Sequence, residues 1–316
     1  MNQDLQALGI DVGGTKTAAV RVSASGAVLA REALPTPADD MQATLETIVR
    51  AARAVLTPEV RAIGIGAAGL VEAGTGRLTF APNLAWRNVP LVEHMWEAVG
   101  LPTIADNDNN VAAWGEYRLG VGRGRSHLLF VGVGTGIGGG LVADGKLFRG
   151  AHGFAAEIGH IIVEPAGPLC GCGNHGCWEQ VASGHAVTRA GREAARQHPQ
   201  SMIARRCDGD PARVTGPLVT ECARAGDPVA RGILAQVGRR LGEGIAGLVN
   251  VLDPEVVAVG GGAAAAGDLL LEPARVAFAE SVEASAHRPD VPIVAAFLGA
   301  QAGAIGAAML ALDELT

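Results

Sequence analysis

The chain has 316 residues, with 25 Lys and Arg against 32 Asp and Glu and a formal charge of −7 at pH 7. This length predicts about two domains, and a hydrophobic share of 48% with only 18% charged residues excludes a disordered polyelectrolyte. Gly is frequent, at 45 residues, but it has no three-residue period, so collagen is excluded and tight turns or close approaches to a ligand remain.

Strand and helix patterns alternate along the first third of the chain. The strand patterns lie at residues 8–12, 17–22, 61–66 and 103–105, and the helix patterns lie at residues 42–56 and 109–119. In residues 42–56 the apolar side chains recur at every third or fourth position, which is the period of a helix with one buried face. The alternation predicts an α/β fold with helices packed on a sheet.

A second copy of the opening pattern begins near Leu128. Residues 131–136 repeat the strand and glycine break of residues 10–15, and residues 139–143 then resume a strand. Two related halves of this type predict a cleft between them, with a glycine turn on each side. The remaining patterns are a polar excursion at residues 200–217, a helix at 229–251, and a strand at 256–259 followed by Gly260, Gly261 and Gly262.

Targeting and membrane signals are weak in this sequence. Residues 1–6 contain Asp4 and lack a basic region, so we expect no signal peptide. The longest uncharged run, residues 291–312, is mostly Ala and Gly and includes Pro292 and Gln301, so we expect a strand, a turn and a helix of the core, not a membrane span. Five Cys without a secretory signal indicate a reducing compartment, and we expect a cytoplasmic protein.

Glycine-rich turns allow three interpretations. The pattern Gly-x-Gly-x-x-Gly begins at Gly64 and again at Gly134, but neither copy opens a helix, as a dinucleotide site requires. Residues 9–14 have P-loop glycine spacing, yet Thr15 and Lys16 follow in the reverse of the required order. The third interpretation is a pair of hairpin turns whose N–H groups bind anions.

Asp11 bears on the choice between an anion-binding turn and a glycine that only serves a tight turn. An acidic side chain at a strand end, beside a turn that binds phosphate, is expected where a cation neutralises both. Tight turns alone remain the alternative.

Three cysteines form the strongest local signal. Cys170, Cys172 and Cys177 lie on a glycine-rich stretch, where their thiolates can converge on one ion. A tetrahedral zinc site needs a fourth ligand, for which His160 and His175 are the candidates. We favour His160, because His175 lies inside the loop; the alternative is reduced structural cysteines without a metal.

A metal at His160 would also orient the nearby carboxylates. Glu157 lies three residues before His160, and Glu179 lies just after Cys177. Two carboxylates on a metal-braced loop suit a polyol ligand, because ionised carboxylates accept hydrogen bonds from adjacent hydroxyls.

Residues 106–110 read Asp-Asn-Asp-Asn-Asn between a strand and a helix. One interpretation is helix capping, in which an Asp or Asn accepts from the N–H groups of the first turn. The other is a general base together with an amide that fixes the substrate, because one cap needs only one residue. The chemistry of the residues leaves both open.

Six motifs in order resemble the ROK (repressor, ORF, kinase) sugar kinases, and the match is strongest to the bacterial ATP-dependent glucokinases of this family. The motifs are residues 11–16, 107–108, 134–139, 157–160, 170–179 and 259–262, supported by 113–117 and 177–180. The resemblance implies an actin-like, ribonuclease-H-like two-domain fold with an interdomain cleft. The small domain would be residues 1–115 with the C-terminal helix 302–316, and the large domain, with its zinc-binding loop, residues 116–301.

The resemblance also implies roles for single residues. Asp108 matches the catalytic base. The sugar contacts would be Gly69, Asn83, Asn107, Asp108, Glu157, His160 and Glu179. The nucleotide and its phosphates would be held by Asp11, Gly13, Gly14, Thr15, Lys16, Thr135, Gly136, Gly260, Gly261 and Gly262. The zinc ligands would be His160, Cys170, Cys172 and Cys177.

Two flanking residues depart from the family pattern. The family commonly has Glu before the Asn-Asp pair and Ala after it, whereas this chain has Asp106 and Asn109. These departures bear on fine specificity more than on the reaction.

The resemblance implies transfer of the ATP γ-phosphoryl group to the 6-hydroxyl of glucose, with Mg²⁺ and a structural Zn²⁺. The alternatives are a kinase of N-acetylglucosamine, N-acetylmannosamine, mannose or fructose, and a glucokinase that uses polyphosphate. We expect a homo-oligomer, a dimer or a tetramer, with neither a nucleic acid nor a membrane as partner.

A sugar-sensing repressor is the rival from a different class, because the family includes some. Such proteins carry a DNA-binding module before the sugar-kinase fold, and here the first strand pattern begins by about Leu8, so we expect none. The charge of −7 and only 11 aromatic residues also oppose binding to nucleic acid.

Overall fold

The computed structural model describes residues 5–81 and 86–316. Contacts divide the chain into two compact units. The first unit comprises residues 1–130, 140–156 and 296–316, and the second comprises residues 131–139 and 157–295. The domain boundaries expected from the sequence, at residues 115 and 302, stay a prediction.

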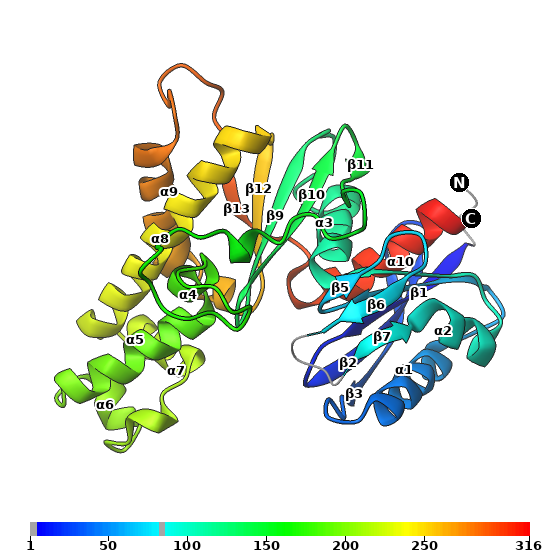
Figure 1. Ribbon diagram of the computed structural model, residues 1–316, viewed down its shortest axis with the longest axis horizontal. Coiled ribbons are helices and arrows are strands. Elements are labelled where there is room, and N and C mark those ends of the chain that lie inside the picture. The colour runs from blue at the N-terminus through cyan, green and yellow to red at the C-terminus, as the bar shows by residue number, and fades with distance from the viewer. Residues whose placement is uncertain (1–4, 82–85) are drawn as a thin grey trace. The chain divides into compact units, whose positions relative to one another are not determined.

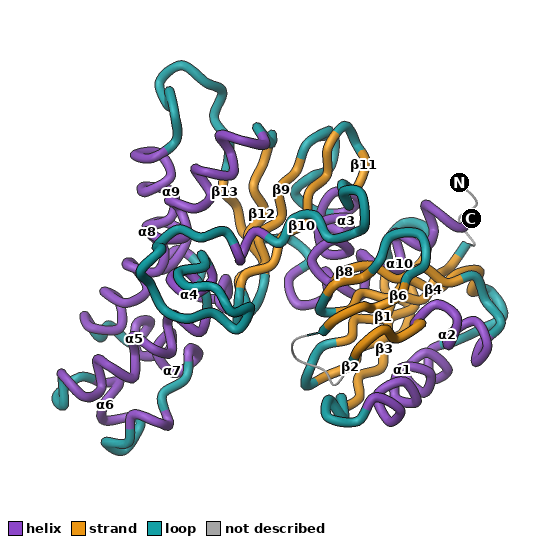
Figure 2. Tube along the Cα trace, viewed as in Figure 1, coloured by secondary structure: helices purple, strands orange, loops and turns teal. Residues whose placement is uncertain are grey.

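The first unit is built on a five-stranded sheet with the order β3-β2-β1-β4-β8 (Figures 1 and 2). Its strands are β1 (Gln6–Val12), β2 (Lys16–Ser23), β3 (Val28–Pro35), β4 (Val60–Ala67) and β8 (Thr103–Asn107). The pairs β1–β2 and β2–β3 are antiparallel, whereas β1–β4 and β4–β8 are parallel. The helices of this unit are α1 (Met41–Val55), α2 (Leu91–Val99), α3 (Asp108–Leu119) and α10 (Ala302–Leu315).

Helices cover both faces of this sheet. On one face Leu8, Ile10 and Ile63 pack in a core that includes the buried residues of α1 and α2. On the other face Ala7 and Ala62 pack against α10. Figure 1 shows α10, in red, on the opposite side of the sheet from α1, in blue. The alternating strand pattern predicted from the sequence therefore produces a three-layered unit.

Small residues bring α10 unusually close to the sheet. A Cβ atom on Gly9 of β1 would overlap the carbonyl oxygen of Ala304, and one on Gly64 of β4 would overlap that of Ala307. A Cβ atom on Gly306 would overlap the carbonyl oxygen of Val111 in α3. These glycines are needed because backbone meets backbone at these points, with no space for a side chain.

A small antiparallel sheet also belongs to the first unit. Its order is β5-β6-β7, with β5 (Leu70–Val71), β6 (Arg77–Phe80) and β7 (Arg87–Pro90). The sequence patterns did not predict these short strands. A second five-stranded sheet has the order β11-β10-β9-β12-β13. Its strands are β9 (Leu128–Val133), β10 (Ile137–Ala143), β11 (Lys146–Leu147), β12 (Val256–Gly260) and β13 (Ile293–Ala295).

Helices make up most of the second unit (Figure 2). They are α4 (Glu179–Ala182), α5 (Gly184–Gln197), α6 (Met202–Arg206), α7 (Gly216–Arg224), α8 (Pro228–Leu252) and α9 (Asp268–Ser281). The long helix α8 packs along α9 and also contacts α5 and α7. Residues 200–217, expected to be an irregular excursion, instead form α6, a short 3₁₀ turn and the start of α7.

The uncharged run at residues 291–312 has the predicted form of a strand, a turn and a helix: β13, a 3₁₀ turn (Gly299–Gln301) and α10. In the part of the chain that the structure describes, no helix is long and apolar enough to cross a membrane.

Candidate functional site

Three parallel strands of the first unit end at one edge of the sheet. Asp11 of β1 pairs with Gly66 of β4, and Gly66 pairs with Asp106 of β8, so these residues form one row across the strands. Asp108 begins α3 directly after β8. In open α/β sheets ligands bind outside the carboxyl ends of the strands, and the acidic residues lie at that edge.

Asn107 is the N-cap of α3. Its Oδ1 accepts from the backbone N–H groups of Asn109, at 2.8 Å, and Asn110, at 3.3 Å. Its Nδ2 donates to the carbonyl oxygen of Gly69 at 3.0 Å. The capping interpretation is therefore correct for Asn107, and the cap fixes Asp108 as the first residue of the helix. Asn107 and Gly69, both expected as sugar contacts, are bonded to each other.

The carboxylate of Asp108 accepts two hydrogen bonds from the next residue, Asn109. Its Oδ1 accepts from the backbone N–H of Asn109 at 3.0 Å and from Nδ2 of the same residue at 2.9 Å. Burial raises the pKa of Asp108, and the hydrogen bonds from Asn109 act against this rise. A carboxylate at a helix N-terminus is also stabilised by the helix dipole. Such a group is suited to take a proton.

Asp11 lies near the end of β1, close enough to Asp108 to interact with it electrostatically. Burial, and then the negative charge of Asp108, raise the pKa of Asp11 from its usual 3.8 to about 7, while Lys16 lowers it. A buried carboxylate whose proton affinity is raised by a second carboxylate is suited to a cation that neutralises it beside a phosphate.

Asp106 is buried and fully engaged. Its Oδ1 accepts from the backbone N–H of Asn107 and from Nδ2 of Asn110, both at 2.8 Å. Its Oδ2 accepts from Nε of Arg149 at 2.6 Å, and Arg149 also donates to Glu314 of α10 at 2.7 Å. Asp106 therefore braces the segment that carries Asn107 and Asp108.

The first glycine turn is a hairpin. The N–H of Gly13 donates to the carbonyl of Lys16 at 3.0 Å, and Val12 pairs with Thr17 across the turn. The strand β2 follows directly, so this turn has the geometry of a hairpin and not of a P-loop, which leads into a helix, and anion binding there stays a prediction. Gly14 and Thr15, also predicted as phosphate contacts, lie in this turn.

The second glycine turn joins β9 to β10 in the second unit. The N–H of Gly134 donates to the carbonyl of Gly136 at 3.0 Å. The carbonyls of Gly134 and Thr135 accept from Gly184 and His185 at the start of α5, at 2.9 and 3.1 Å. This turn is also a hairpin, as predicted, and the helix start fixes its position.

Glycines after β12 lie beside the end of β9. Gly261 has a φ of +86°, and a Cβ atom there would lie 2.6 Å from the carbonyl oxygen of Val133. The predicted nucleotide segments at residues 134–136 and 260–262 are thus neighbours within the second unit. Only glycine permits this approach.

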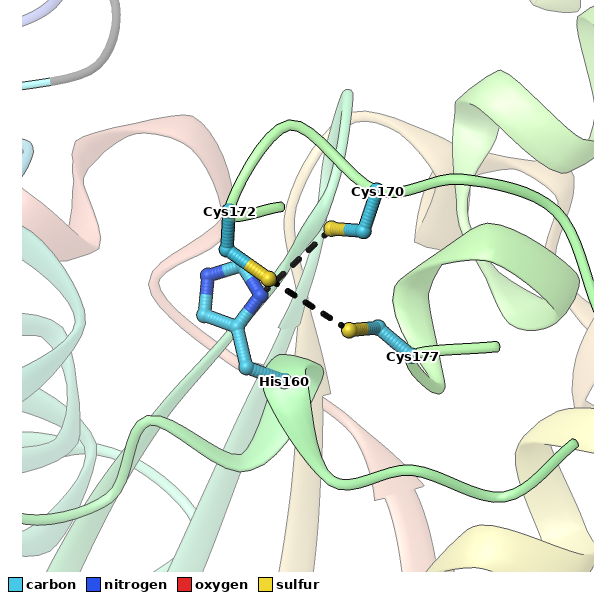
Figure 3. Close-up of side chains that lie close together, drawn as sticks. All are labelled: His160, Cys170, Cys172 and Cys177. Carbon is cyan, nitrogen blue, oxygen red and sulfur yellow. Dashed lines mark hydrogen bonds between the residues drawn. The ribbon is translucent and has the colours of Figure 1, made fainter. Parts of the chain in front are cut away.

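Three cysteines and His160 converge in the second unit (Figure 3). Sγ of Cys170 lies 3.7 Å from Nδ1 of His160, and Sγ of Cys172 lies 3.6 Å from Sγ of Cys177. All four ligand atoms lie within 4.8 Å of one another. A tetrahedral zinc ion with bonds of about 2.3 Å to sulfur sets its ligands roughly 3.8 Å apart, so the set fits zinc.

Burial raises the pKa of the Cys170 thiol to about 12 and also raises the pKa of Cys177. A hydrogen bond from the backbone of Asn174 lowers the pKa of Cys172. Zinc binds the thiolate form, so a metal here would have to displace protons from two thiols that burial keeps protonated.

Glutamates surround His160. Oε2 of Glu157 lies 4.0 Å from Nε2 of His160, and Oε1 of Glu179 lies 4.0 Å from Nδ1. Glu179 also accepts from Sγ of Cys170 at 3.0 Å and, through Oε2, from the N–H of Ile137 at 3.3 Å. The sugar contacts predicted for this unit lie together, and Glu179 links the cysteine cluster to the second glycine turn.

Two further candidates from the sequence are Asn83 and His175. Asn83 is outside the described residues. Nδ1 of His175 lies 3.1 Å from the carbonyl of Gly167, and this side chain is not in the cysteine cluster found among residues 5–81 and 86–316. The sequence placed Asp106 and Asn109 in the polar cluster at residues 106–110 but did not predict the hydrogen bonds that these two residues make.

Comparison with known proteins identifies the relatives of this chain. The ROK family matches residues 7–314. A protein named glucokinase from Streptomyces coelicolor is 42% identical over 309 residues, which cover 97% of each chain. A protein named N-acetylmannosamine kinase from Escherichia coli is 34% identical over 308 residues, which cover 97% of this chain and 98% of the relative.

A solved structure has the same architecture. The crystal structure of a ROK family glucokinase from Streptomyces griseus, in complex with glucose and AMPPNP, superposes with a TM-score of 0.89. It is 40% identical, with 98% of this chain and 99% of that chain covered. The predicted actin-like sugar-kinase fold is confirmed.

Proposed function

This chain belongs to the ROK family, and we propose that it is an ATP-dependent glucokinase that transfers the γ-phosphoryl group of ATP to the 6-hydroxyl of glucose. The observation that carries the proposal is the match to glucokinases along nearly the whole chain, at 42% identity in sequence and with a TM-score of 0.89 in structure. The related crystal structure holds glucose and AMPPNP, which is an analogue of ATP.

Asp108 is the proposed general base. Its carboxylate accepts the proton of the 6-hydroxyl while that oxygen forms a bond to the γ-phosphorus, and the bond from this phosphorus to the β-bridging oxygen breaks, leaving ADP. Proton removal of this kind contributes about 10²–10⁴-fold to the rate. Asn107 supports the geometry, because its cap holds Asp108 at the helix start and its Nδ2 is tied to Gly69.

Charge and position supply the larger part of phosphoryl transfer. In this proposal the turns at residues 13–16 and 134–136 direct N–H groups and Lys16 at the phosphates. Mg²⁺, when bound, neutralises charge on the phosphates, and the proton affinity of Asp11 makes it the carboxylate suited to that cation or to its water shell.

The sugar is bound in this proposal by Asn83, Asn107, Glu157, His160 and Glu179. Zinc, when bound to His160 and the three cysteines, holds the imidazole in one orientation. Glu157 lies on the segment that leads to His160, so fixing the imidazole also restricts Glu157. Hydroxyls of a sugar satisfy carboxylates that accept several hydrogen bonds.

A coupled ADP-release assay over a panel of hexoses, with ATP and with polyphosphate as donors, tests this function. We expect the highest kcat/KM with glucose and ATP, and no turnover in Asp108→Asn. Turnover with N-acetylmannosamine but not glucose would establish the second candidate, which the 34% identical N-acetylmannosamine kinase favours. Turnover with polyphosphate but not with ATP would show that polyphosphate, and not ATP, is the phosphoryl donor.

We also propose a homo-oligomer, a dimer or a tetramer, on the ground of family membership. Light scattering of the purified protein at several concentrations measures it, and a mass of one chain at all of them would exclude it.

A further inference from the structure

The side chain of Asn109 lies directly on the Asp108 carboxylate. Its Nδ2 donates to Oδ1 of Asp108 at 2.9 Å, and its backbone N–H donates to the same oxygen at 3.0 Å. One residue thus supplies both of these hydrogen bonds to Oδ1. Hydrogen bonds to a charged acceptor are stronger than those between neutral groups and restrict its rotation more.

The backbone of Asn109 is itself fixed. Its N–H also lies 2.8 Å from Oδ1 of the cap residue Asn107. On the other side a Cβ atom on Gly140 of β10 would lie only 2.5 Å from the carbonyl oxygen of Asn109, so the strand passes close against it. With the backbone held on both sides, the Asn109 amide has a defined position from which to orient the carboxylate.

We propose that Asn109 is a positioning residue for phosphoryl transfer: its amide holds Oδ1 of Asp108, so that Oδ2 faces the sugar hydroxyl and accepts the proton. This inference rests on the proposed function. It assigns to Asn109 the task of keeping Asp108 ionised and in one rotamer while the sugar binds.

The charges around Asp108 explain why a donor is needed. Asp11 of β1 lies near enough for the charge of Asp108 to raise its pKa, and Lys16 at the start of β2 lowers the pKa of Asp11. Burial adds to the cost of the ionised form of Asp108. The side-chain amide of Asn109 is one of the hydrogen bonds that lower the pKa of Asp108 against these effects, so its loss raises that pKa.

The test compares the variants Asn109→Ala and Asn109→Asp with wild type. Asn109→Ala removes only the side-chain donor and keeps the backbone N–H, whereas Asn109→Asp puts an acceptor of nearly the same shape in its place. The base must be ionised to act, so activity rises with pH through the pKa of Asp108. We expect the acidic limb of kcat/KM to move to higher pH in Asn109→Ala and further in Asn109→Asp.

Other kinetic values separate positioning from damage to the fold. At pH values above the limb we expect kcat to fall by about tenfold or less in Asn109→Ala, while KM for the sugar changes by less than about threefold. The matched control is Asn110→Ala, which removes an amide from the same turn that is bonded to Asp106 at 2.8 Å. We expect the control to melt at a lower temperature, with its acidic limb unmoved.

A measurement without turnover accompanies the kinetics. In enzyme labelled with ¹³C at the Asp carboxyls, the resonance that disappears in Asp108→Asn belongs to Asp108, and its titration gives the pKa directly. We expect it to titrate at higher pH in both Asn109 variants. Unchanged titration and an unmoved limb in folded Asn109 variants would overturn the inference, as would an equal shift in Asn110→Ala.

The experiments distinguish failure of the proposed role of Asn109 from failure of the proposed function. The profiles are measured with whichever hexose has the highest kcat/KM, so a wrong sugar assignment changes only the substrate. An active wild type with an unmoved Asn109→Ala limb contradicts the role of Asn109 alone, whereas full activity in Asp108→Asn contradicts the proposed base.

Discussion

Carboxylates at the edge of the first sheet lower the stability of the folded protein, because their charges are buried. Asp11 is mostly buried and faces Asp108, and its pKa of about 7 means that folding favours its protonated form near neutral pH. A charge held in such a place is expected where a ligand compensates for it. The position of Asp11 therefore lowers the free energy of unfolding in the absence of a bound cation.

The raised pKa of Asp11 predicts a pH-dependent gain of stability in Asp11→Asn. Because the pKa of Asp11 is about 7 in the folded state and near 3.8 when exposed, the folded protein binds more protons than the unfolded one between these values. Wild-type stability therefore falls as pH rises from about 4 to 7, and the variant lacks this loss. We expect Asp11→Asn to be more stable by about 2 kcal/mol above pH 7 and inactive.

Thermal unfolding of both proteins at pH 5 and pH 8, without added metal, measures the effect. The melting temperature of the variant should exceed that of wild type at pH 8 by more than it does at pH 5. Equal differences at the two pH values, or a variant less stable at pH 8, would show that Asp11 is not held in a costly ionised state.

At this scale the sequence predicted where polar residues gather, but not the hydrogen bonds between them. The motif at residues 107–108 singled out Asp108, and the structure places this residue at the start of α3, directly after the carboxyl end of β8. The amide bond from Asn109 and the bond from Arg149 to Asp106 were not predictable. Each depends on a side-chain rotamer and, for Arg149, on a partner 43 residues away, which no local pattern encodes.

Among the elements, α10 has the most restrictive packing. Gly306 meets the backbone of α3 at Val111, while Gly9 and Gly64 let α10 lie against β1 and β4. Closeness of this kind maximises dispersion contacts but leaves no room for a methyl group. Replacement of a helical glycine by alanine can therefore raise or lower the free energy of unfolding, depending on which atoms lie beside the new Cβ.

A pair of glycine-to-alanine changes makes this testable. In Gly306→Ala the new Cβ would overlap the carbonyl oxygen of Val111, so we expect a loss of about 3 kcal/mol or more in the free energy of unfolding. In Gly232→Ala, inside α8, no described atom apart from the adjacent residues and the nearby backbone of α8 itself lies within 4 Å of the new Cβ, and we expect a gain of about 0.5–1 kcal/mol from helix propensity. Urea unfolding of both variants measures it, and equal effects would contradict the packing argument.

The cysteine loop predicts a coupled loss. Cys172→Ser removes one of four converging ligands, so we expect zinc content to fall and the affinity for sugar to weaken together, because His160 loses its fixed orientation. Elemental analysis and titration of sugar binding follow the two quantities. Cys207→Ser, which changes a buried thiol outside the cluster, is the control and should keep its zinc. Wild type that is free of metal and fully active would contradict this role of zinc.

Element prediction succeeded where periodicity was long and failed where it was short. The helix expected at residues 42–56 is α1 (Met41–Val55), and the strand expected at 61–66 is β4 (Val60–Ala67). The strands β5 to β7 were missed, because segments of two to four residues do not show a period. The helices α6 and α7 were missed because they are short, begin within the polar stretch at residues 200–217 and are stabilised by packing against α5.

Across the whole molecule the most informative feature is the interruption of the first unit. Residues 131–139 and 157–295 form a separate compact unit, and the chain then returns at residue 296 to complete the first one. The helix supplied by the returning segment covers one face of a sheet made by residues 6–107. The resemblance to the family implied that the last helix packs on the first unit. Local sequence patterns cannot predict this, because the contact joins segments far apart in the sequence.

The interruption predicts the behaviour of fragments. A fragment of residues 1–156 lacks α10, so the small-residue face of Ala7, Gly9 and Ala62 is exposed, and we expect no cooperative thermal transition. Addition of a peptide of residues 296–316 should restore a transition, because it supplies the missing layer. Circular dichroism melts with and without the peptide measure this, and identical cooperative melts would contradict the prediction.

The close contact of α10 with β1 and β4 also has a consequence for biosynthesis. The ribosome synthesises α10 only after every residue of the second unit. Until then, the face of the sheet that α10 covers in the folded protein lacks this helix. During that interval the small-residue surface of β1 and β4 is accessible to chaperones. The sheet that begins the chain is therefore among the last parts of the protein to be completed.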